Sequence, residues 1–167
     1  VAVSADGQWI AAARADKKIK LWSVTNPKEA KLLAGHEKTL TCLQFSPDGM
    51  KLVSGAADQS IRVWDVQEGE LSTQGTGPSE VNAVAWIADG RQIASGGADQ
   101  VIRIWKLPET PGGELSQAGE LKGHEAAITA LAAVPPKGGE IISGSSDGSL
   151  RHWKIEGGKM LKEMKHG

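Results

Sequence analysis

Three residue types that make up the catalytic triads of hydrolases occur in one stretch of the sequence: His36, Ser54 and Asp58. A serine hydroxyl becomes a nucleophile when an imidazole accepts its proton and a carboxylate orients the imidazole. A histidine and an aspartate could instead bind a metal ion. Neither His36 with Asp58 nor His124 with Asp147 is accompanied by further ligands at suitable spacing, so we expect no metal. We also expect no cofactor, because the glycine pairs punctuate turns and form no phosphate-binding loop.

The same residue types recur at fixed offsets along the chain, which argues against catalysis. Four tryptophans are separated by 42, 41 and 48 residues: Trp22, Trp64, Trp105 and Trp153. An aspartate stands six residues before each of them: Asp16, Asp58, Asp99 and Asp147. A serine stands ten residues before the last three, at Ser54, Ser95 and Ser143, and Ala12 takes this place in the first unit. An active site normally occurs once in a chain, so the repetition predicts structural networks and a protein that is not an enzyme.

The period is that of four-stranded propeller blades, and the sequence within each unit is strand-like. In the second unit we expect strands at 39–45, 51–55 and 60–66, with a weaker outer strand near 70–73. The turn at 46–49 contains Pro47, Asp48 and Gly49, which suit tight turns. Most of the extra length of the third unit falls at 107–113, where we expect an exposed loop between its third and fourth strands. The predicted fold class is therefore all-β.

Composition excludes several functional classes. The 167 residues carry 19 Lys and Arg against 20 Asp and Glu, a net charge of -1, which argues against nucleic acid as a partner. No apolar run reaches the roughly 18 residues of a membrane helix, so we expect no membrane segment. The single cysteine, Cys42, lies among apolar residues and is expected to be a buried, inert thiol. We expect a single domain over 1–167 and a cytoplasmic location.

The second unit closely resembles the repeats of the WD-repeat (WD40) family. The resemblance rests on four segments, which are Gly35-His36, Ser46-Pro47-Asp48-Gly49, Ser54-Gly55 and Ile61-Arg62-Val63-Trp64-Asp65. It covers the entire chain and implies a β-propeller of four four-stranded antiparallel blades, at about 1–34, 35–75, 76–122 and 123–167. Two departures stand out. Thr76-Gly77 replaces Gly-His in the third unit, and only Asp65 completes the Trp-Asp pair.

The resemblance also implies a buried hydrogen-bonded chain of His, Ser, Asp and Trp within a blade. The matching residues are His36, Ser54, Asp58 and Trp64 in blade 2 and His124, Ser143, Asp147 and Trp153 in blade 4. Such a chain pairs each buried polar group, because the indole donates to the serine and the serine hydroxyl to the imidazole. In blade 3, Gly77 should leave Ser95 and Asp99 without an imidazole.

The resemblance implies a non-catalytic scaffold that binds proteins or peptides. Partner contacts are expected on a face formed by Lys38, Gln59, Glu80, Gln100 and Glu125. A basic residue two positions before each repeat tryptophan is expected to form a repeated surface feature: Lys20, Arg62, Arg103 and Arg151. Trp86 aligns with Phe45 and is expected to pack in the core. One alternative is a sensory or regulatory propeller tail of a larger multidomain enzyme. Another is a small-ligand or catalytic site in the central channel, for which the expected inner-strand residues supply no suitable cluster.

Four WD-type blades are expected to leave an open arc with two exposed apolar faces. We therefore expect a head-to-tail homodimer, in which each chain supplies half of an eight-bladed ring. His166 falls where a loop would deliver a histidine to the next blade, which in the dimer belongs to the neighbouring chain. The alternatives are a truncated piece of a longer propeller and a closed four-bladed monomer.

Overall fold

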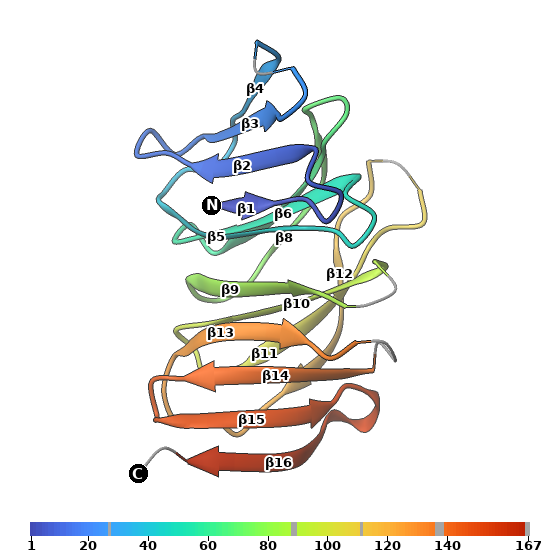
Figure 1. The fold of residues 1–167 in the computed structure, drawn as a ribbon. Helices are drawn as coiled ribbons and strands as arrows, with labels where there is room; N and C mark the ends of the chain where they lie inside the picture. The colour runs from blue at the N-terminus through green and yellow to red at the C-terminus, as the bar shows by residue number, and fades with distance from the viewer. Residues whose placement is uncertain (27, 88–89, 111, 136–138, 166–167) are drawn as a thin grey trace.

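The computed structural model describes residues 1–26, 28–87, 90–110, 112–135 and 139–165. Within these ranges the chain forms four four-stranded antiparallel sheets, each with its strands in sequence order (Figure 1). Blade 1 comprises β1 (Ala2–Val3), β2 (Trp9–Ala13), β3 (Ile19–Ser23) and β4 (Ala30–Leu33). Blade 2 comprises β5 (Leu40–Phe45), β6 (Lys51–Ala56), β7 (Ser60–Asp65) and β8 (Leu71–Thr76). Blade 3 comprises β9 (Val81–Trp86), β10 (Gln92–Gly97), β11 (Ile102–Lys106) and β12 (Ser116–Leu121). Blade 4 comprises β13 (Ile128–Ala133), β14 (Glu140–Ser145), β15 (Ser149–Lys154), the short 3-10 helix η1 (Glu156–Gly158) and β16 (Lys159–Lys165). The all-β prediction is confirmed.

Turn chemistry sets the strand pairing in blade 2. Gly49 has a φ of 72°, a conformation that costs glycine little, and its N–H donates to the carbonyl of Ser46. The Ser46 hydroxyl donates to Asp48, and that carboxylate accepts the N–H of Met50. The corresponding turn of blade 3 includes Ala88 and Asp89, which lie outside the described residues. The outer strand β8 runs to Thr76, beyond the expected 70–73.

The hydrophobic core is divided into three clusters, and each lies between two successive blades. The first joins blades 1 and 2, the second joins blades 2 and 3, and the third joins blades 3 and 4. Trp64, Trp105 and Trp153 each pack toward the preceding blade. We call the tryptophan-bearing face of a blade its leading face and the opposite face its trailing face. Side chains alternate along a strand, so both faces of a blade receive apolar side chains. For example, the neighbouring residues Leu52 and Val53 belong to different clusters.

Blades 1 and 4 lie at opposite ends of the arrangement in Figure 1. The leading face of blade 1 and the trailing face of blade 4 therefore have no neighbouring blade among the described residues.

Among the described residues no helix has the length and apolar character needed to cross a membrane. Cys42 is partly buried beside the second cluster, and this burial raises the pKa of its thiol to about 11. The thiol is therefore protonated at neutral pH.

Glycine allows adjacent blades to approach closely. A Cβ atom added to Gly96 of β10 would lie 2.6 Å from Cγ2 and 3.0 Å from Cβ of Ile128 in blade 4. In the outer strand of the same blade, a Cβ added to Gly119 would meet nothing within 4 Å. A comparison of substitutions at Gly96 and Gly119 therefore distinguishes crowding between blades from the general effect of replacing a glycine in a strand.

We predict that Gly96→Ala destabilises the protein by about 1–3 kcal/mol, because the extra methyl group overpacks the contact between blades 3 and 4. Gly119→Ala is the matched control and should be neutral or slightly stabilising. Denaturant titrations of both variants measure the difference. Equal stabilities of the two variants would show that the contact between blades 3 and 4 accommodates a methyl group more easily than the structure indicates.

Candidate functional site

Blade 2 contains a continuous chain of hydrogen bonds from its tryptophan to its aspartate. The indole N–H of Trp64 donates to the Ser54 hydroxyl oxygen at 2.9 Å, and that oxygen lies 2.7 Å from Nε2 of His36. Nδ1 of His36 lies 3.0 Å from a carboxylate oxygen of Asp58. Strand β6 provides Ser54, β7 provides Trp64, and His36 arrives on the segment before β5. The arrangement fits a neutral imidazole that accepts from Ser54 and donates to Asp58.

Blade 4 repeats this chain. Trp153 donates to Ser143 at 2.8 Å, Ser143 lies 2.6 Å from Nε2 of His124, and Nδ1 of His124 lies 2.9 Å from Asp147. The structure therefore brings together all eight residues that the sequence assigns to the two networks. Both serines are fully buried, so no substrate can reach their hydroxyl groups. Despite its triad composition, the arrangement is built to pair buried polar groups.

A second serine, which the sequence interpretation did not include, completes each network. Ser60 donates to Asp58 at 2.6 Å, and Ser149 donates to Asp147 at 2.6 Å. Both stand two residues after the aspartate. The recurrence was readable in the sequence, because a serine takes this place only in the two blades with complete networks. Blades 1 and 3 have Lys18 and Val101 there.

The networks also set the charge state of their aspartates. Burial would by itself raise the pKa of Asp58, but hydrogen bonds from Ser60, from the backbone N–H of Glu37 and from His36 outweigh it and hold the pKa well below its usual range. The pKa of Asp147 is lowered in the same way, by Ser149, the N–H of Glu125 and His124 acting against burial. Each carboxylate is therefore ionised.

The imidazole of His36 is held in its neutral form. Burial lowers its pKa, and this effect exceeds the opposing influence of Asp58. A neutral ring can donate from Nδ1 and accept at Nε2, as the hydrogen-bond distances require.

Blade 3 contains a different network. Trp105 still donates to Ser95 at 2.8 Å, but the carboxylate of Asp99 pairs with the guanidinium of Arg103 at 2.6 Å. Gly77 supplies no side chain, and a cavity of about 10 Å³, roughly the size of one water, remains beside Ser95 and Asp99. The sequence predicted that the imidazole is missing, but it did not predict that Arg103 pairs with Asp99 in its place.

The residue before the histidine position also differs between these blades. In blades 2 and 4 that residue is a glycine, and a guanidinium lies against it. A Cβ on Gly35 would fall 2.0 Å from Nη1 of Arg62, and one on Gly123 would fall 3.1 Å from Nη1 of Arg151. Blade 3 has Thr76 at this position. There the guanidinium of Arg103 extends to Asp99 and, at 3.6 Å, to Glu120.

Blade 1 has neither the serine nor the buried tryptophan. Ala12 replaces the serine, and Trp22 is only partly buried. The Lys20 ammonium lies 4.8 Å from the centre of the Trp22 ring, and Asp16 pairs with Arg14 at 3.1 Å.

The prediction that the basic residues before each tryptophan form a repeated surface feature is wrong. Arg151 is only 7% exposed and pairs with Glu163 at 2.7 Å. The Arg103 side chain is 12% exposed. These residues share the leading face with the tryptophan, and in blades 2 to 4 a neighbouring blade covers that face.

The residues expected to contact a partner are all exposed and lie at one end of the blades. We call them the turn face: Lys38, Gln59, Glu80, Gln100 and Glu125. Backbone hydrogen bonds hold the contributing loops together, from Ala57 to Thr39 in blade 2 and from Ala98 to Glu80 in blade 3. Gln59 and Gln100 adopt positive φ values of 71° and 69° at the turn tips, which project their side chains from the sheets. Strand β13 starts at this end, on the left in Figure 1.

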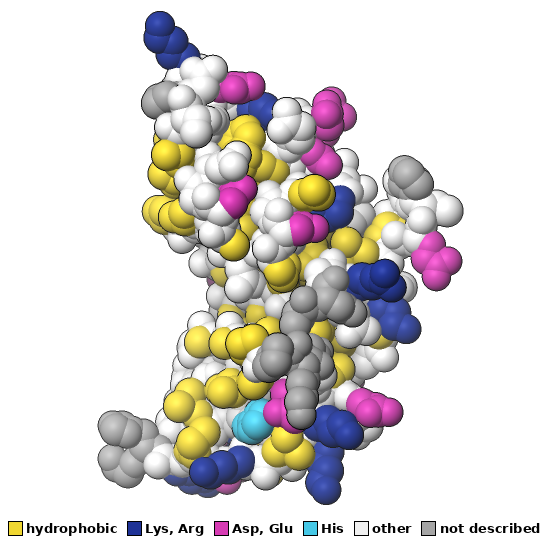
Figure 2. Space-filling model, turned by 45° about the vertical axis from the view of Figure 1, so that its right-hand side comes forward, with side chains coloured by type: hydrophobic (Ala, Val, Ile, Leu, Met, Phe, Trp, Pro, Cys, Tyr) yellow, Lys and Arg dark blue, Asp and Glu magenta, His cyan; other side chains and the backbone are white. Residues whose placement is uncertain are grey.

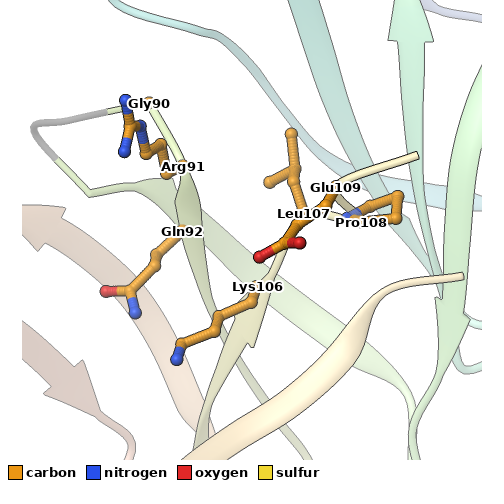
Figure 3. A pocket seen from close by; sticks show the side chains of 7 residues that line it. All are labelled: Gly90, Arg91, Gln92, Lys106, Leu107, Pro108 and Glu109. Atoms are coloured by element: carbon orange, nitrogen blue, oxygen red, sulfur yellow. The ribbon is translucent and has the colours of Figure 1, made fainter. Parts of the chain in front are cut away.

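A larger pocket, of about 590 Å³, lies at the opposite end of blade 3 (Figure 3). Figure 3 shows the side chains of Gln92 and Lys106 extending in the same direction, with Leu107, Pro108 and Glu109 on the other side. The described residues that line it include no serine, cysteine or histidine that could act as a nucleophile. Among the described residues no cluster of three or more metal-binding side chains occurs. The sequence predicted a loop here but not a pocket.

We predict that Asp58→Ala costs about 1–3 kcal/mol, because it leaves His36 and Ser60 without a buried acceptor. Asp99→Ala should cost less, at most about 1 kcal/mol, since the charged partner of Asp99 is an arginine that Glu120 also contacts, and its other bond is a long one of 3.5 Å from the N–H of Val101. Matched denaturant titrations measure both losses. Equal losses would contradict the conclusion that blade 3 does not depend on the histidine network.

We predict that stability falls as the pH drops through about 6.5, the ordinary pKa of histidine. The unfolded chain then binds a proton at position 36, whereas the folded chain does not, because burial lowers the pKa of His36. The stabilisation is complete above the unfolded pKa and is lost below it, with a slope of up to about 1.4 kcal/mol per pH unit. Asp58 and Asp147, whose pKa values are also lowered, add a further loss only near pH 4. Unfolding titrations between pH 5 and 8 should give a smaller slope for His36→Gln than for the parent chain. Identical slopes would assign the dependence to other groups.

Comparison with known proteins agrees with the geometry. The family model of the WD domain, G-beta repeat, matches residues 1–23, 27–65, 69–106 and 115–154. The chain is 27% identical over 152 residues to the CCR4-associated factor 4 homolog of Candida glabrata, covering 91% of this chain and 20% of that protein. It is 28% identical over 171 residues to the transcription factor unc-37 of Caenorhabditis elegans, covering 99% of this chain and 26% of that protein. It is 28% identical over 155 residues to the nuclear distribution protein nudF of Emericella nidulans, covering 92% of this chain and 34% of that protein. The chain thus spans about a fifth to a third of the length of these relatives. Four matched repeats, each on one sheet of the structure, show that the chain belongs to the WD40 repeat family.

Proposed function

We propose that the protein is a non-catalytic scaffold that binds other proteins through the surfaces of its blades. One observation carries the proposal. The two sets of residues with the composition of a catalytic triad are enclosed in two equivalent hydrogen-bonded networks, and their serines are fully buried. The side chains with the most recognisable chemistry therefore stabilise the interior of each blade and leave its outer surfaces for recognition.

The turn face is the proposed contact surface. Its five side chains are exposed and mix one lysine, two glutamates and two glutamines. Such a surface suits a polar protein or peptide partner more than a nucleic acid, whose phosphates require concentrated positive charge. The names of the three relatives describe an associated factor, a transcription factor and a nuclear distribution protein, and none of these names denotes an enzyme.

A second candidate function is a regulatory propeller segment of a larger multidomain protein. It is favoured by the lengths of the relatives, since the matched region makes up 20 to 34% of them. We also propose a cytoplasmic location, where a reducing environment would keep the single cysteine, Cys42, as a free thiol.

We predict that the purified protein hydrolyses no generic ester above the buffer rate, because Ser54 and Ser143 cannot be reached by substrate. Ser54→Ala and Ser143→Ala serve as controls for any residual turnover. Turnover that either substitution abolishes would overturn the scaffold proposal.

Affinity capture of partner proteins tests the binding side of the proposal. Lys38→Glu on the turn face should weaken the capture. Lys154→Glu, an exposed change at the other end of blade 4, should not.

A further inference from the structure

We propose that a groove between the outer parts of blades 3 and 4 binds a lysine side chain of a partner protein. The groove has a volume of about 460 Å³, within the range of ligand pockets, and lies between β12 and the loop that contains η1. This loop follows β15, at the end of the blades opposite the turn face. The proposal rests on the proposed function, because it gives the scaffold a second contact surface and names the chemistry that this surface recognises.

The groove is one of three equivalent seams, where the outer strand of one blade meets the loop after the third strand of the next. In the seam between blades 1 and 2, Lys31 of β4 pairs with Leu21, and its ammonium donates to the carbonyls of Val66 and Gln67. The side chain lies against Gly69, because a Cβ atom added there would fall 2.8 Å from Cδ of Lys31. A lysine of the chain itself therefore closes this seam, with its stem over a glycine and its charge on backbone oxygens of the next blade.

The seam between blades 2 and 3 is closed as well. Thr73 takes the place of the lysine, since it pairs with Val63, the residue before the repeat tryptophan. Its hydroxyl donates to the carbonyl of Gly113 in blade 3 at 2.7 Å. Leu115 of blade 3 is buried, and its N–H bonds the carbonyl of Gln74. Groups of blades 2 and 3 therefore fill this seam from both sides.

The seam between blades 3 and 4 has no side chain at the corresponding place. Gly119 of β12 pairs with Ile104, which also precedes a repeat tryptophan, so it stands where the other blades have the lysine and the threonine. A Cβ atom added to Gly119 would meet nothing within 4 Å. The groove that lies there is lined in part by the apolar side chains of Ile104, Leu121 and Ile155. It can therefore hold the apolar stem of a long side chain.

The loop across the groove matches the loop of blade 2 that accepts the lysine. Three of its residues follow the repeat tryptophan by two, three and five positions, as do the two acceptors and the glycine in blade 2. They are Ile155, Glu156 and Gly158, in place of Val66, Gln67 and Gly69. The N–H of Gly158 already bonds the carbonyl of Ile155. We therefore expect the carbonyl of Glu156 to be the main acceptor for an incoming ammonium.

The charges around the groove favour a cation over an anion. The described residues that line it carry two carboxylates, on Glu120 and Glu156, and one ammonium, on Lys106. The partners of the carboxylates include Lys122 at 2.6 Å and Lys154 at 3.5 Å, and a carboxylate has lone pairs for further donors. An ammonium that enters the groove therefore meets backbone and carboxylate oxygens together.

The surface around the groove points to recognition of a single side chain. Lys106 stands at the boundary with the larger pocket, because it and Gln92 line both (Figure 3). In Figure 2 this end of the blades comes forward, and the Lys, Arg, Asp and Glu side chains of the described residues are interspersed on it, without one broad patch of either charge. A nucleic acid or a strongly acidic partner would need such a patch of positive charge. The local chemistry of the groove, in contrast, needs only one lysine.

Peptide binding followed by NMR tests the proposal on the full chain. The probe is the peptide Ala-Lys-Leu-Leu-Ala with blocked ends, which is the segment 30–34 that carries the lysine of the first seam. We expect the amide signals of Gly119 and Gly158 to shift on titration. A peptide with norleucine in place of the lysine should bind about tenfold more weakly or worse, because the hydrogen bonds of a charged group are lost.

Substitutions on the two walls of the groove locate the binding. Gly119→Lys supplies a lysine from within the chain, at the place that Lys31 has in blade 1, and should abolish peptide binding. Gly119→Ala is the matched control, because it changes the same backbone position and adds only one methyl group, and it should retain binding. Glu156→Gln should weaken binding, whereas Glu68→Gln, an exposed change in the corresponding loop of blade 2, should not. Denaturant titrations verify that each variant is folded.

Three results would overturn the proposal. They are a lysine peptide that causes no shift, a norleucine peptide that binds equally well, and a Gly119→Lys chain that binds the lysine peptide as the parent chain does. A peptide with glutamate in place of the lysine that binds more tightly would assign the groove to acidic partners, through Lys106, and would overturn it too. None of these results would affect the scaffold proposal, which is tested by turnover at Ser54 and Ser143 and by capture at Lys38.

Discussion

A single blade cannot bury the two faces of its own sheet, and this constraint organises the whole molecule. Each four-stranded sheet presents apolar side chains in both directions, so every blade needs a neighbour on each side. The three clusters of the core are therefore contacts between blades, and none lies within one sheet. The close approach of Ile128 to Gly96 shows how tightly this packing is set. The tryptophan repeat follows from the same requirement, because each of the last three tryptophans fills the gap to the preceding blade.

The polar networks extend this packing to groups that cannot be left unpaired. An indole N–H buried between two sheets needs an acceptor, and Ser54, Ser95 and Ser143 provide it in three blades. In blades 2 and 4 the histidine links that serine to an aspartate that also holds the turn between the second and third strands. The network thereby joins the middle of a blade to its exposed end. In blades 2 and 4 the turns beneath the turn face are thus tied to the buried tryptophans.

The four blades could be predicted from repetition at fixed offsets, and the two complete networks could be predicted from the resemblance to WD repeats. Ser54 and Trp64 lie on adjacent paired strands, and the segment before β5 and the turn after β6 bring His36 and Asp58 to them. Ser60 was missed although its recurrence in blade 4 was visible. The pairing of Arg103 with Asp99 was not predicted, because strand position does not tell which partner a long side chain reaches when the imidazole is missing. The burial of Arg151 was mispredicted because position on a strand tells which side a residue faces, but not whether another blade covers that side.

The division of the core into three separate contacts gives the array a one-dimensional cooperativity. Each blade is stabilised only by its immediate neighbours, so blades 2 and 3 have two stabilising contacts among the described residues and the end blades have one. The same independence makes the blade the natural unit of change in evolution. Duplicating or deleting a blade exchanges one contact for another of the same kind, and the remaining clusters keep their composition.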